Sequence, residues 1–248
     1  MRIEIPKTFR GREVEGAIER VLSKQKAQET QPSNQPVPPV NASNLDGFIY
    51  VPSINLYVAK ERSLLGKNWY DSHKELHKQE LRMPTLPEIG ETIFYLRDNQ
   101  NNPELKQVYD DILKKTQSGW HGEWVNAKFK IDDKKYVQTV TGIDSNGELV
   151  YSNLEEITCF DNNCYVDITT QNNVDKQGLP TVKSSDNSYK QGENLYFWYP
   201  RDGSVAGFVA DSDRAGLGCD GGPGGRDDAL GVFACAEGTQ KNAGGSSK

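Results

Sequence analysis

The spacing of the apolar residues changes along the chain, and this change separates a helical first part from a strand-rich second part. Near the N-terminus the apolar residues recur every three or four positions, which is the period of an amphipathic helix. These residues are Val14, Ala17, Ile18, Val21 and Leu22. With Thr8 as the capping residue, the pattern predicts one helix over residues 8–28.

A linker follows this helix. Residues 29–44 are rich in Pro, Gln and Asn, a composition that is typical of an extended, weakly structured connection. The main domain is therefore expected over residues 45–237. The tail, residues 238–248, consists mostly of Gly, Ser, Asn and Lys and is expected to be disordered.

Helical periodicity returns early in the main domain, after strands at 48–57. Three helices are predicted, over residues 70–81, from Thr85 onward with Pro87 in the first turn, and over 103–116. The first of them carries His73 and His77 one turn apart, a spacing that could hold a metal ion. No HExxH glutamate lies between them, so we expect both histidines on an exposed helix face.

After Trp120 the period becomes two, which predicts strands. The predicted strands cover residues 124–131, 135–143, 148–150, 164–168, 195–199, 205–210 and 229–236, with 179–182 extending an edge. Asn146-Gly147 is a hairpin signal between two of them. Because helices come first and strands later, the predicted fold class is α+β.

The segment between the last two strands is unusually rich in glycine. Six of the twelve residues from Arg214 to Gly225 are glycine. A phosphate loop would require Gly-Lys-Ser/Thr or a strand–GxGxxG–helix context, and both are absent. A flexible linker would not carry Leu217, Cys219 and Pro223 at intervals. The remaining interpretation is a fixed framework that alternates with exchangeable positions, whose side chains point to one side of an extended or turn-rich segment.

Charge and hydropathy exclude several classes of protein. The formal net charge is −6, whereas general nucleic-acid binding requires a basic face. No apolar run approaches 18 residues, so no transmembrane helix is expected. The first seven residues lack the apolar core of a signal peptide.

The four cysteines do not form a metal motif. No CxxC pair occurs, and His73, His77 and His121 lie far from the cysteines in sequence. Cys159 and Cys164 could close a small disulfide loop in an oxidising compartment. For Cys219 and Cys235 we expect buried free thiols.

Residues 196–237 carry a resemblance to a known family. This stretch reads from Tyr-Phe-Trp-Tyr-Pro-Arg-Asp-Gly through the glycine-rich segment to Asp-Ala-Leu-Gly-Val-Phe-Ala-Cys-Ala-Glu. It resembles the C-terminal variable region of the target proteins of diversity-generating retroelements, above all those of archaea and their viruses. Two upstream pieces agree with the family, namely Arg-Met-Pro-Thr within 81–89 and Trp-His-Gly-Glu-Trp within 119–124.

The resemblance implies a C-type lectin fold of the formylglycine-generating-enzyme subtype. That fold has a small mixed or antiparallel sheet, two or three helices, and pairing of the first and last strands, here 48–57 with 229–236. The variable region would span 205–236 on a rigid face. We expect Trp120, Trp124, Phe197 and Trp198 to be framework residues that hold this face.

The family's mechanism also accounts for the composition of the segment. Its reverse transcriptase mutates adenines, so asparagine codons in the template become codons for Gly, Asp, Ser or Arg. The predicted exchangeable, ligand-binding positions are Gly216, Gly218, Asp220, Gly222, Gly224, Gly225 and Asp227. The implied function is binding of a macromolecular ligand, most plainly a protein. The segment departs from the family in presenting few bulky residues, which give the most contact area.

Three other functions share this fold or this composition. A formylglycine-generating-type enzyme would need a reactive cysteine pair, and the spacing of Cys219 and Cys235 does not resemble one. A calcium-dependent sugar-binding lectin would need a Glu-Pro-Asn or Gln-Pro-Asp loop, which is absent. A structural protein that decorates a particle overlaps with the binding hypothesis.

An aspartate cluster could bind calcium, but such residues are more often solvated loop residues or caps. Its members are Asp211, Asp213, Asp220, Asp227 and Asp228. We therefore expect a binding protein with no catalytic residues, cofactor or metal.

Overall fold

The computed structural model describes residues 8–9, 12–13, 46–117 and 119–238, and the chain divides into two compact units, 1–38 and 39–248. In the first unit, β1 (Thr8–Phe9) pairs antiparallel with β2 (Arg12–Glu13). The helix predicted over 8–28 therefore does not begin at Thr8. Thr and Phe favour extended backbone. The remainder of that prediction, 14–28, the linker 29–44 and the tail from 239 lie outside the described residues.

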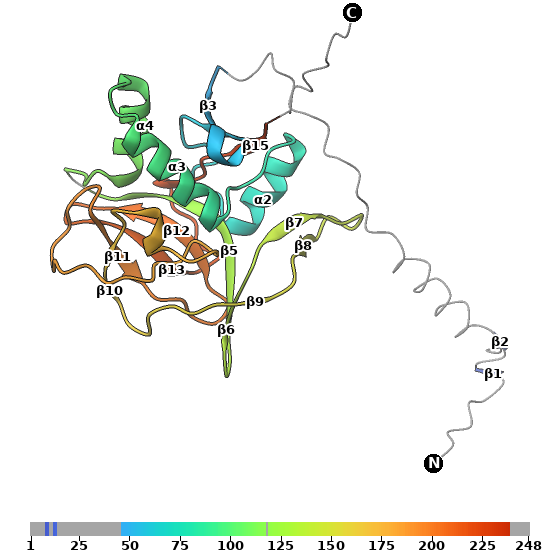
Figure 1. The fold of residues 1–248 in the computed structure, drawn as a ribbon. Coiled ribbons are helices and arrows are strands. Elements are labelled where there is room, and N and C mark those ends of the chain that lie inside the picture. Colours follow the sequence, from blue (N-terminus) through green and yellow to red (C-terminus); the bar gives the residue numbers. More distant parts are fainter. Residues whose placement is uncertain (1–7, 10–11, 14–45, 118, 239–248) are drawn as a thin grey trace, which may run out of the picture. The chain divides into compact units, whose positions relative to one another are not determined.

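The second unit is built around an eight-stranded mixed sheet with the order β10-β11-β13-β12-β5-β6-β9, in which β14 also pairs with β5 (Figure 1). Its strands are β5 (His121–Ile131), β6 (Lys135–Gln138), β9 (Glu155–Glu156), β10 (Cys164–Asp167), β11 (Asn194–Trp198), β12 (Val205–Ala210), β13 (Ala215–Gly221) and β14 (Leu230–Gly231). The pairs β11–β13 and β14–β5 are parallel, and the others are antiparallel.

A separate three-stranded sheet joins the two ends of this unit, with the order β15-β4-β3. Its strands are β3 (Phe48–Val51), β4 (Leu56–Ala59) and β15 (Cys235–Glu237). A short 3-10 turn, Pro52–Ile54, connects β3 to β4. Cys235 pairs with Val58 and Glu237 with Leu56. The expected pairing of the first and last strands is confirmed.

Three α-helices lie in the described residues, close to the predicted positions. They are α2 (Trp69–Lys78), α3 (Leu86–Asp98) and α4 (Pro103–Leu113). Asn68 and Asn102 cap α2 and α4, and α3 begins with a capping box between Thr85 and Glu88. The last helix ends at Leu113 rather than 116, because Lys114 is extended.

The hairpin predicted at Asn146-Gly147 is confirmed. It joins β7 (Val140–Ile143) to β8 (Leu149–Tyr151), and Gly147 has a φ of +80°. The single strand predicted over 135–143 is wrong, because β6 and β7 belong to different sheets. The buried side chain of Asn126 explains the break, since its Oδ1 accepts from Val140 N at 2.7 Å and its Nδ2 donates to Val140 O at 2.9 Å.

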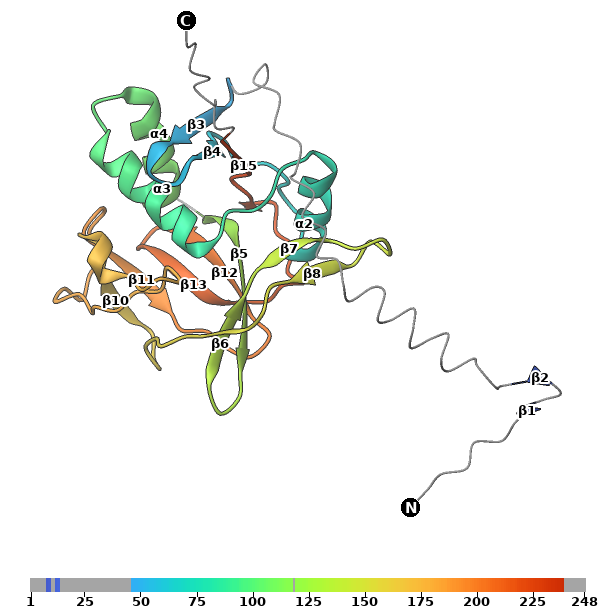
Figure 2. The same ribbon diagram turned by 45° about the vertical axis from the view of Figure 1, so that its right-hand side comes forward.

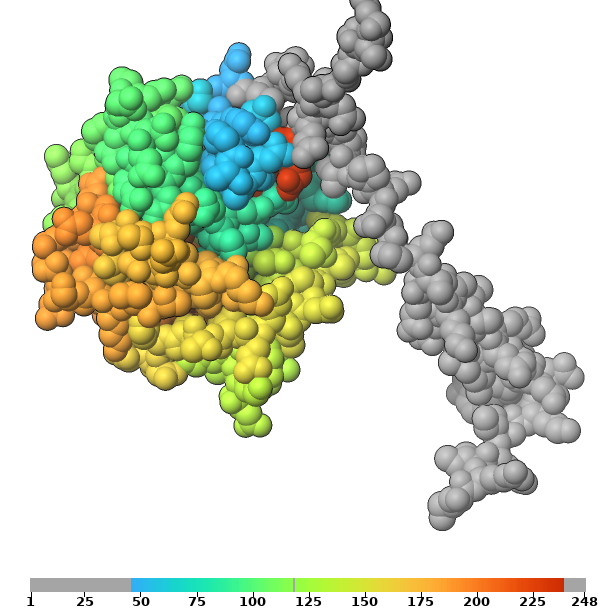
Figure 3. Space-filling model, in the orientation of Figure 1, coloured from blue at the N-terminus to red at the C-terminus, as the bar shows by residue number. Residues whose placement is uncertain are grey.

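Two hydrophobic clusters form the core. The larger one lies between α3, α4 and the inward residues of β11, β12 and β13. The smaller one contains Trp69, Leu76, Met83 and Trp124, where α2 and the β7–β8 hairpin lie together (Figure 2). Figure 3 shows the helical layer directly against the strands and loops drawn in yellow and orange. The described structure is thus α+β, and none of its helices combines the length and the apolar character needed to cross a bilayer.

Three strand predictions need correction. Residues 179–182 form a single isolated bridge, between Pro180 and Val174, because proline cannot donate to a ladder. The strand predicted over 229–236 divides into β14 and β15, with Val232 paired to Ser63 between them. The glycine-rich segment, for which no strand is predicted, contains the seven-residue strand β13.

The tryptophans provide a test of the packing. Trp124 is 5% exposed, and its Nε1 donates to Lys67 O at 3.1 Å, whereas Trp120 is 38% exposed and is not a core residue. We expect Trp124→Ala to lower the free energy of unfolding by about 3–5 kcal/mol through the cavity that it leaves. The matched change Trp120→Ala should cost less than about 1 kcal/mol. Urea unfolding measures both, and equal losses would contradict this assignment of the core.

Candidate ligand-binding surface

Strand β13 separates the framework residues of the glycine-rich segment from its predicted exchangeable residues. Ala215, Leu217 and Cys219 point into the larger core cluster. Because successive residues of a strand alternate between faces, Gly216, Gly218 and Asp220 lie on the opposite face. Framework and exchangeable residues therefore alternate between the two faces as predicted, because they belong to an ordinary strand.

Aromatic side chains from two neighbouring strands lie on this same outer face. In β11, Leu195 and Phe197 are core residues, whereas Tyr196 and Trp198 are half-buried on the other side. Tyr196 makes edge contacts with Tyr165 of β10, at 5.0 Å between ring centroids, and with Trp198, at 4.8 Å. The guanidinium carbon of Arg214 lies 4.5 Å from the centroid of the Tyr196 ring. The outer face thus carries a fixed row of three rings and a cation.

The glycines of β13 lie beneath or beside these rings and differ in the space around them. A Cβ placed on Gly216 would come within 2.2 Å of Tyr196 O and 2.4 Å of the Trp198 ring. The prediction that Gly216 accepts any side chain is therefore wrong. At Gly218 the nearest atom would be 3.6 Å away, which is an ordinary contact. Gly221 is tight, with Val205 O at 3.0 Å and the Trp124 ring at 3.2 Å.

The loop after β13 is open to solvent. Gly222, Gly224 and Gly225 are exposed, and a Cβ on Gly222 or Gly224 would meet nothing within 4 Å. None of the glycines from 216 to 225 has a positive φ. The backbone geometry of these glycines is ordinary, so their conformation does not require glycine.

Backbone hydrogen bonds hold this loop in place. Trp69 N donates to Pro223 O at 3.1 Å, and Gly66 N donates to Asp227 O at 3.1 Å. Within the loop, Gly225 N donates to Gly222 O at 2.9 Å. Since main-chain atoms make these bonds, the loop conformation does not depend on the side chains at 222, 224 and 225.

The charged residues of the loop have local partners. Asp227 Oδ1 accepts from Ala229 N at 2.8 Å, and Arg226 pairs with Asp71 at 2.5 Å. Near the start of β13, Asp211 Oδ1 accepts from the backbone N–H groups of Asp213 and Arg214. These are the local caps that the sequence suggested. The described residues hold no group of three or more His, Cys, Asp or Glu side chains that could bind a metal ion.

The cysteines are placed as buried or half-buried free thiols. Cys219 lies on β13 and not in a loop, and Cys235 lies on β15 beside Arg82, whose Nη1 is 3.3 Å from its sulfur. Burial raises the pKa of both thiols well above the usual range. Because the thiolate is the reactive form of cysteine, neither site favours nucleophilic chemistry. Cys159 and Cys164 are also free and form no disulfide loop.

The two histidines of α2 lie in different environments. His77 is exposed, as predicted, but His73 is 5% exposed and packs edge-on against Trp69 at 4.3 Å between centroids. Its Nε2 has no hydrogen-bond partner among the described residues, and burial lowers the pKa of His73 to about 3. The expected exposure of His73 is wrong, because α2 is buried along the face that carries Trp69, Ser72, His73 and Leu76.

A buried ion pair lies close to β14. Glu123 on β5 is 1% exposed, and its Oε2 accepts from Arg62 Nε at 3.0 Å while its Oε1 has no partner in the described structure. Arg62 Nη2 also donates to Asp111 O, which His121 Nε2 contacts at 2.8 Å. Burial raises the pKa of Glu123 to about 7, against the opposing effect of Arg62. Apart from the Trp-x-x-Glu-Trp motif, no sequence signal indicates this pair.

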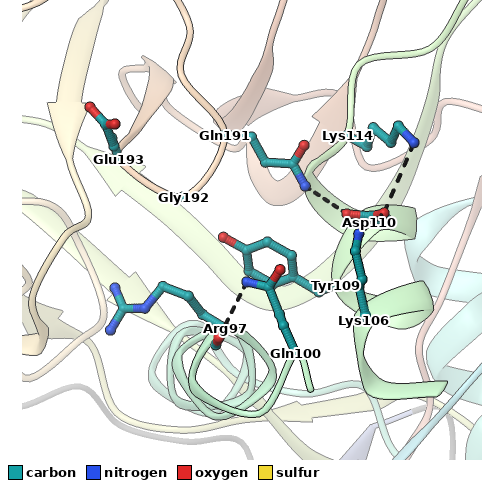
Figure 4. Close-up of a pocket in the computed structure, with 9 residues that line it drawn as sticks. All are labelled: Arg97, Gln100, Lys106, Tyr109, Asp110, Lys114, Gln191, Gly192 and Glu193. Carbon is teal, nitrogen blue, oxygen red and sulfur yellow. Dashed lines mark hydrogen bonds and ion pairs between the residues drawn. The ribbon is translucent and has the colours of Figure 1, made fainter. Parts of the chain in front are cut away.

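A hollow lies on the helical side of the sheet, with a volume of about 570 Å³ (Figure 4). Its polar groups largely satisfy one another. Asp110 accepts from Lys106 at 2.7 Å and from Gln191 at 2.8 Å, and Arg97 donates to the carbonyl oxygens of Ile168 and Thr169. These bonds leave little to recognise a ligand, so the outer face of β11 and β13 with the loop 222–227 remains the candidate surface.

Comparisons with known proteins add no relative: a scan against protein-family models, a search of curated proteins and a search of solved structures each found no match for this chain.

The raised pKa of Glu123 predicts a specific pH dependence. The protonated carboxyl is favoured in the folded protein, so its stabilising contribution is complete below pH 4.5 and is lost as the pH rises through about 7. Glu123→Gln keeps an oxygen for Arg62 and cannot ionise. We expect the variant to gain stability relative to the natural protein between pH 4.5 and 7, by an amount on the order of 3 kcal/mol, and no further gain above that range.

Urea unfolding at several pH values measures this difference. The matched control is Glu61→Gln, an exposed glutamate beside Arg62, whose difference from the natural protein should not follow this curve. A flat difference for Glu123→Gln across the range would show that the buried carboxyl stays ionised.

Proposed function

We propose that this chain is a ligand-binding protein whose C-terminal segment is diversified by a retroelement, on a C-type lectin fold of the formylglycine-generating-enzyme subtype. The proposed exchangeable residues are Gly218, Asp220, Gly222, Gly224, Gly225 and Asp227. Gly216 is left out because Tyr196 and Trp198 occupy the space of a side chain there. The proposed ligand is a macromolecule, most plainly a protein.

One observation supports this proposal: exposed glycines occupy positions whose backbone conformation does not require glycine. Glycine is normally kept where φ is positive or where a neighbour approaches closely. Gly222 and Gly224 have no positive φ, and no atom lies within 4 Å of the place that a Cβ would take at either residue. Adenine mutagenesis of asparagine codons would explain the glycines at these positions, whereas backbone conformation and packing do not require them.

The surroundings of these positions suit a variable surface. The loop backbone is held by N–H groups of Gly66 and Trp69, which lie outside the segment. Next to Gly216 and Gly218 of β13, the row of Tyr165, Tyr196 and Trp198 offers rigid aromatic area, which gives much contact for little loss of conformational entropy. Fixed rings supply general contact, and exchanged residues would select among ligands.

The two alternatives on the same fold have less support. A formylglycine-generating-type enzyme needs a reactive cysteine pair, whereas Cys219 and Cys235 lie in different sheets and their ionisation is disfavoured. A calcium-dependent lectin needs converging acidic ligands. In the described chain Asp211 and Asp227 are engaged by their own backbone.

Simultaneous substitution of the loop tests whether the surface is exchangeable. We expect Gly222→Ser, Gly224→Tyr and Gly225→Asn together to leave the fold unchanged and the thermal midpoint within a few degrees, because the main-chain bonds are kept. The matched change Gly216→Ser should lower the midpoint markedly, and Leu217→Asp should unfold the protein by placing an unpaired charge in the core. Circular dichroism and thermal unfolding measure all three.

Binding itself is tested with a displayed library. Random codons at 218, 220, 222, 224, 225 and 227 are selected against a panel of unrelated folded proteins. The expected result is a different specific loop sequence for each target. Recovery of no binder from a well-folded library would contradict the proposed function. In the genome, the proposal requires a near-copy of the coding stretch for 205–236 beside a reverse transcriptase gene.

A further inference from the structure

A lysine at the border of the variable surface is held by aromatic rings and has no acidic partner. Lys128 on β5 is half-buried, and its Nζ lies over the rings of Tyr70 and Tyr151, at 5.5 and 5.2 Å from their centroids. Tyr70 belongs to α2 and Tyr151 to β8. Cation–π contacts of this kind fix the position of an ammonium group without neutralising it.

The polar atoms of this group have no partners of their own. Among residues 46–117 and 119–238, Lys128 Nζ makes no ion pair or hydrogen bond, and neither do the hydroxyl groups of Tyr70 and Tyr151. The nearby acids are already engaged, since Glu148 lies 3.8 Å from Lys74 and Asp71 pairs with Arg226. An ammonium has three protons to donate, and two phenols add one each.

Sheet register places this group next to the exchangeable residues. Lys128 is opposite Val205 of β12, and Val205 is opposite Gly221 of β13. Two strand spacings separate Lys128 from Gly221, a distance of about 10 Å. Trp124 and the two rings beneath Lys128 pack against the same hydrophobic cluster, and the Trp124 ring lies against Gly221. A ligand on the loop 222–227 is therefore within reach of Lys128.

We propose that Lys128, Tyr70 and Tyr151 form a fixed subsite for a carboxylate group of the ligand. The inference rests on the proposed function, because it assigns the subsite to the ligand of the variable surface. One cation with two neutral donors matches a monoanion. Phosphate groups carry nearly two charges at pH 7 and usually engage several cations or backbone N–H groups. The net charge of −6 further disfavours a dianion.

The subsite is tested with simple anions on the full chain. Sodium acetate is titrated at constant ionic strength against sodium chloride, and sodium phosphate is titrated in parallel. The reporter is the indole N–H signal of Trp69 in nitrogen-edited NMR spectra, because its ring stacks on Tyr151 at 6.5 Å and its N–H is held by Val125 O. We expect a saturable shift with acetate, and a much smaller or unsaturated response with chloride and phosphate.

Three variants assign the effect to the residues. Lys128→Met should abolish the saturable shift. Tyr70→Phe and Tyr151→Phe keep the rings under the ammonium and should weaken acetate binding at least five-fold without changing the thermal midpoint. The matched control is Lys130→Met, two residues further along β5 and 3.5 Å from Asp132, which should bind acetate like the natural protein.

Several results would overturn the subsite. These are a saturable shift that survives in Lys128→Met, stronger binding of phosphate than of acetate, or no saturable shift with acetate. Neither titration nor variants involve the loop residues. A negative acetate result therefore does not contradict the proposed function, and a library that yields no binder does not contradict the carboxylate subsite.

Discussion

Main-chain hydrogen bonding between the two ends of the second unit is the constraint on which the rest of this structure depends. Residues 56–69 run alongside residues 237–223 as one seam: β4 pairs with β15, Ser63 pairs with Val232, and Gly66 and Trp69 donate to the loop carbonyls. Because backbone atoms make this seam, it specifies the course of the segment but not its side chains. A loop in which three of six residues are glycine is held in one conformation by the opposite end of the domain.

Charged residues stabilise the seam at two points, one partly buried at Arg82 and one buried at Glu123. Arg82 pairs with Cys235 as an isolated bridge and binds Glu88, which in turn closes the capping box of α3. Arg62 joins Glu123 of β5 to the last turn of α4 through Asp111 O. Both arginines therefore connect the seam to the helical layer. An ion pair of this kind is costly to break by removing one partner, even where its net stabilisation is small.

The helices and most strands were predictable because their periodicity and caps are local. Thr85 with Glu88 and Asn146 with Gly147 are signals within four residues of the feature that they determine. The wrong predictions concern residues whose surroundings are formed by elements distant in the sequence. Nothing near His73 indicates that β7 and β8 cover α2, and Gly216 looks exchangeable until Trp198 is brought over it from β11. The alternation along β13 was predictable from spacing, whereas the cation held by Tyr70 and Tyr151 joins three separate elements and leaves no pattern in the sequence.

The seam also determines when the two ends of the unit can pair during folding. Leu56 and Glu237 are about 180 residues apart in the chain, so their pairing closes a loop nearly as long as the unit itself. Contacts of such large sequence separation form slowly, and they cannot form during synthesis until the C-terminal strand has left the ribosome. Closure of the three-stranded sheet is therefore a late step in folding, and a chain that stops short of β15 lacks the strand that closes it. Closure of this sheet therefore requires synthesis of the chain at least through Glu237.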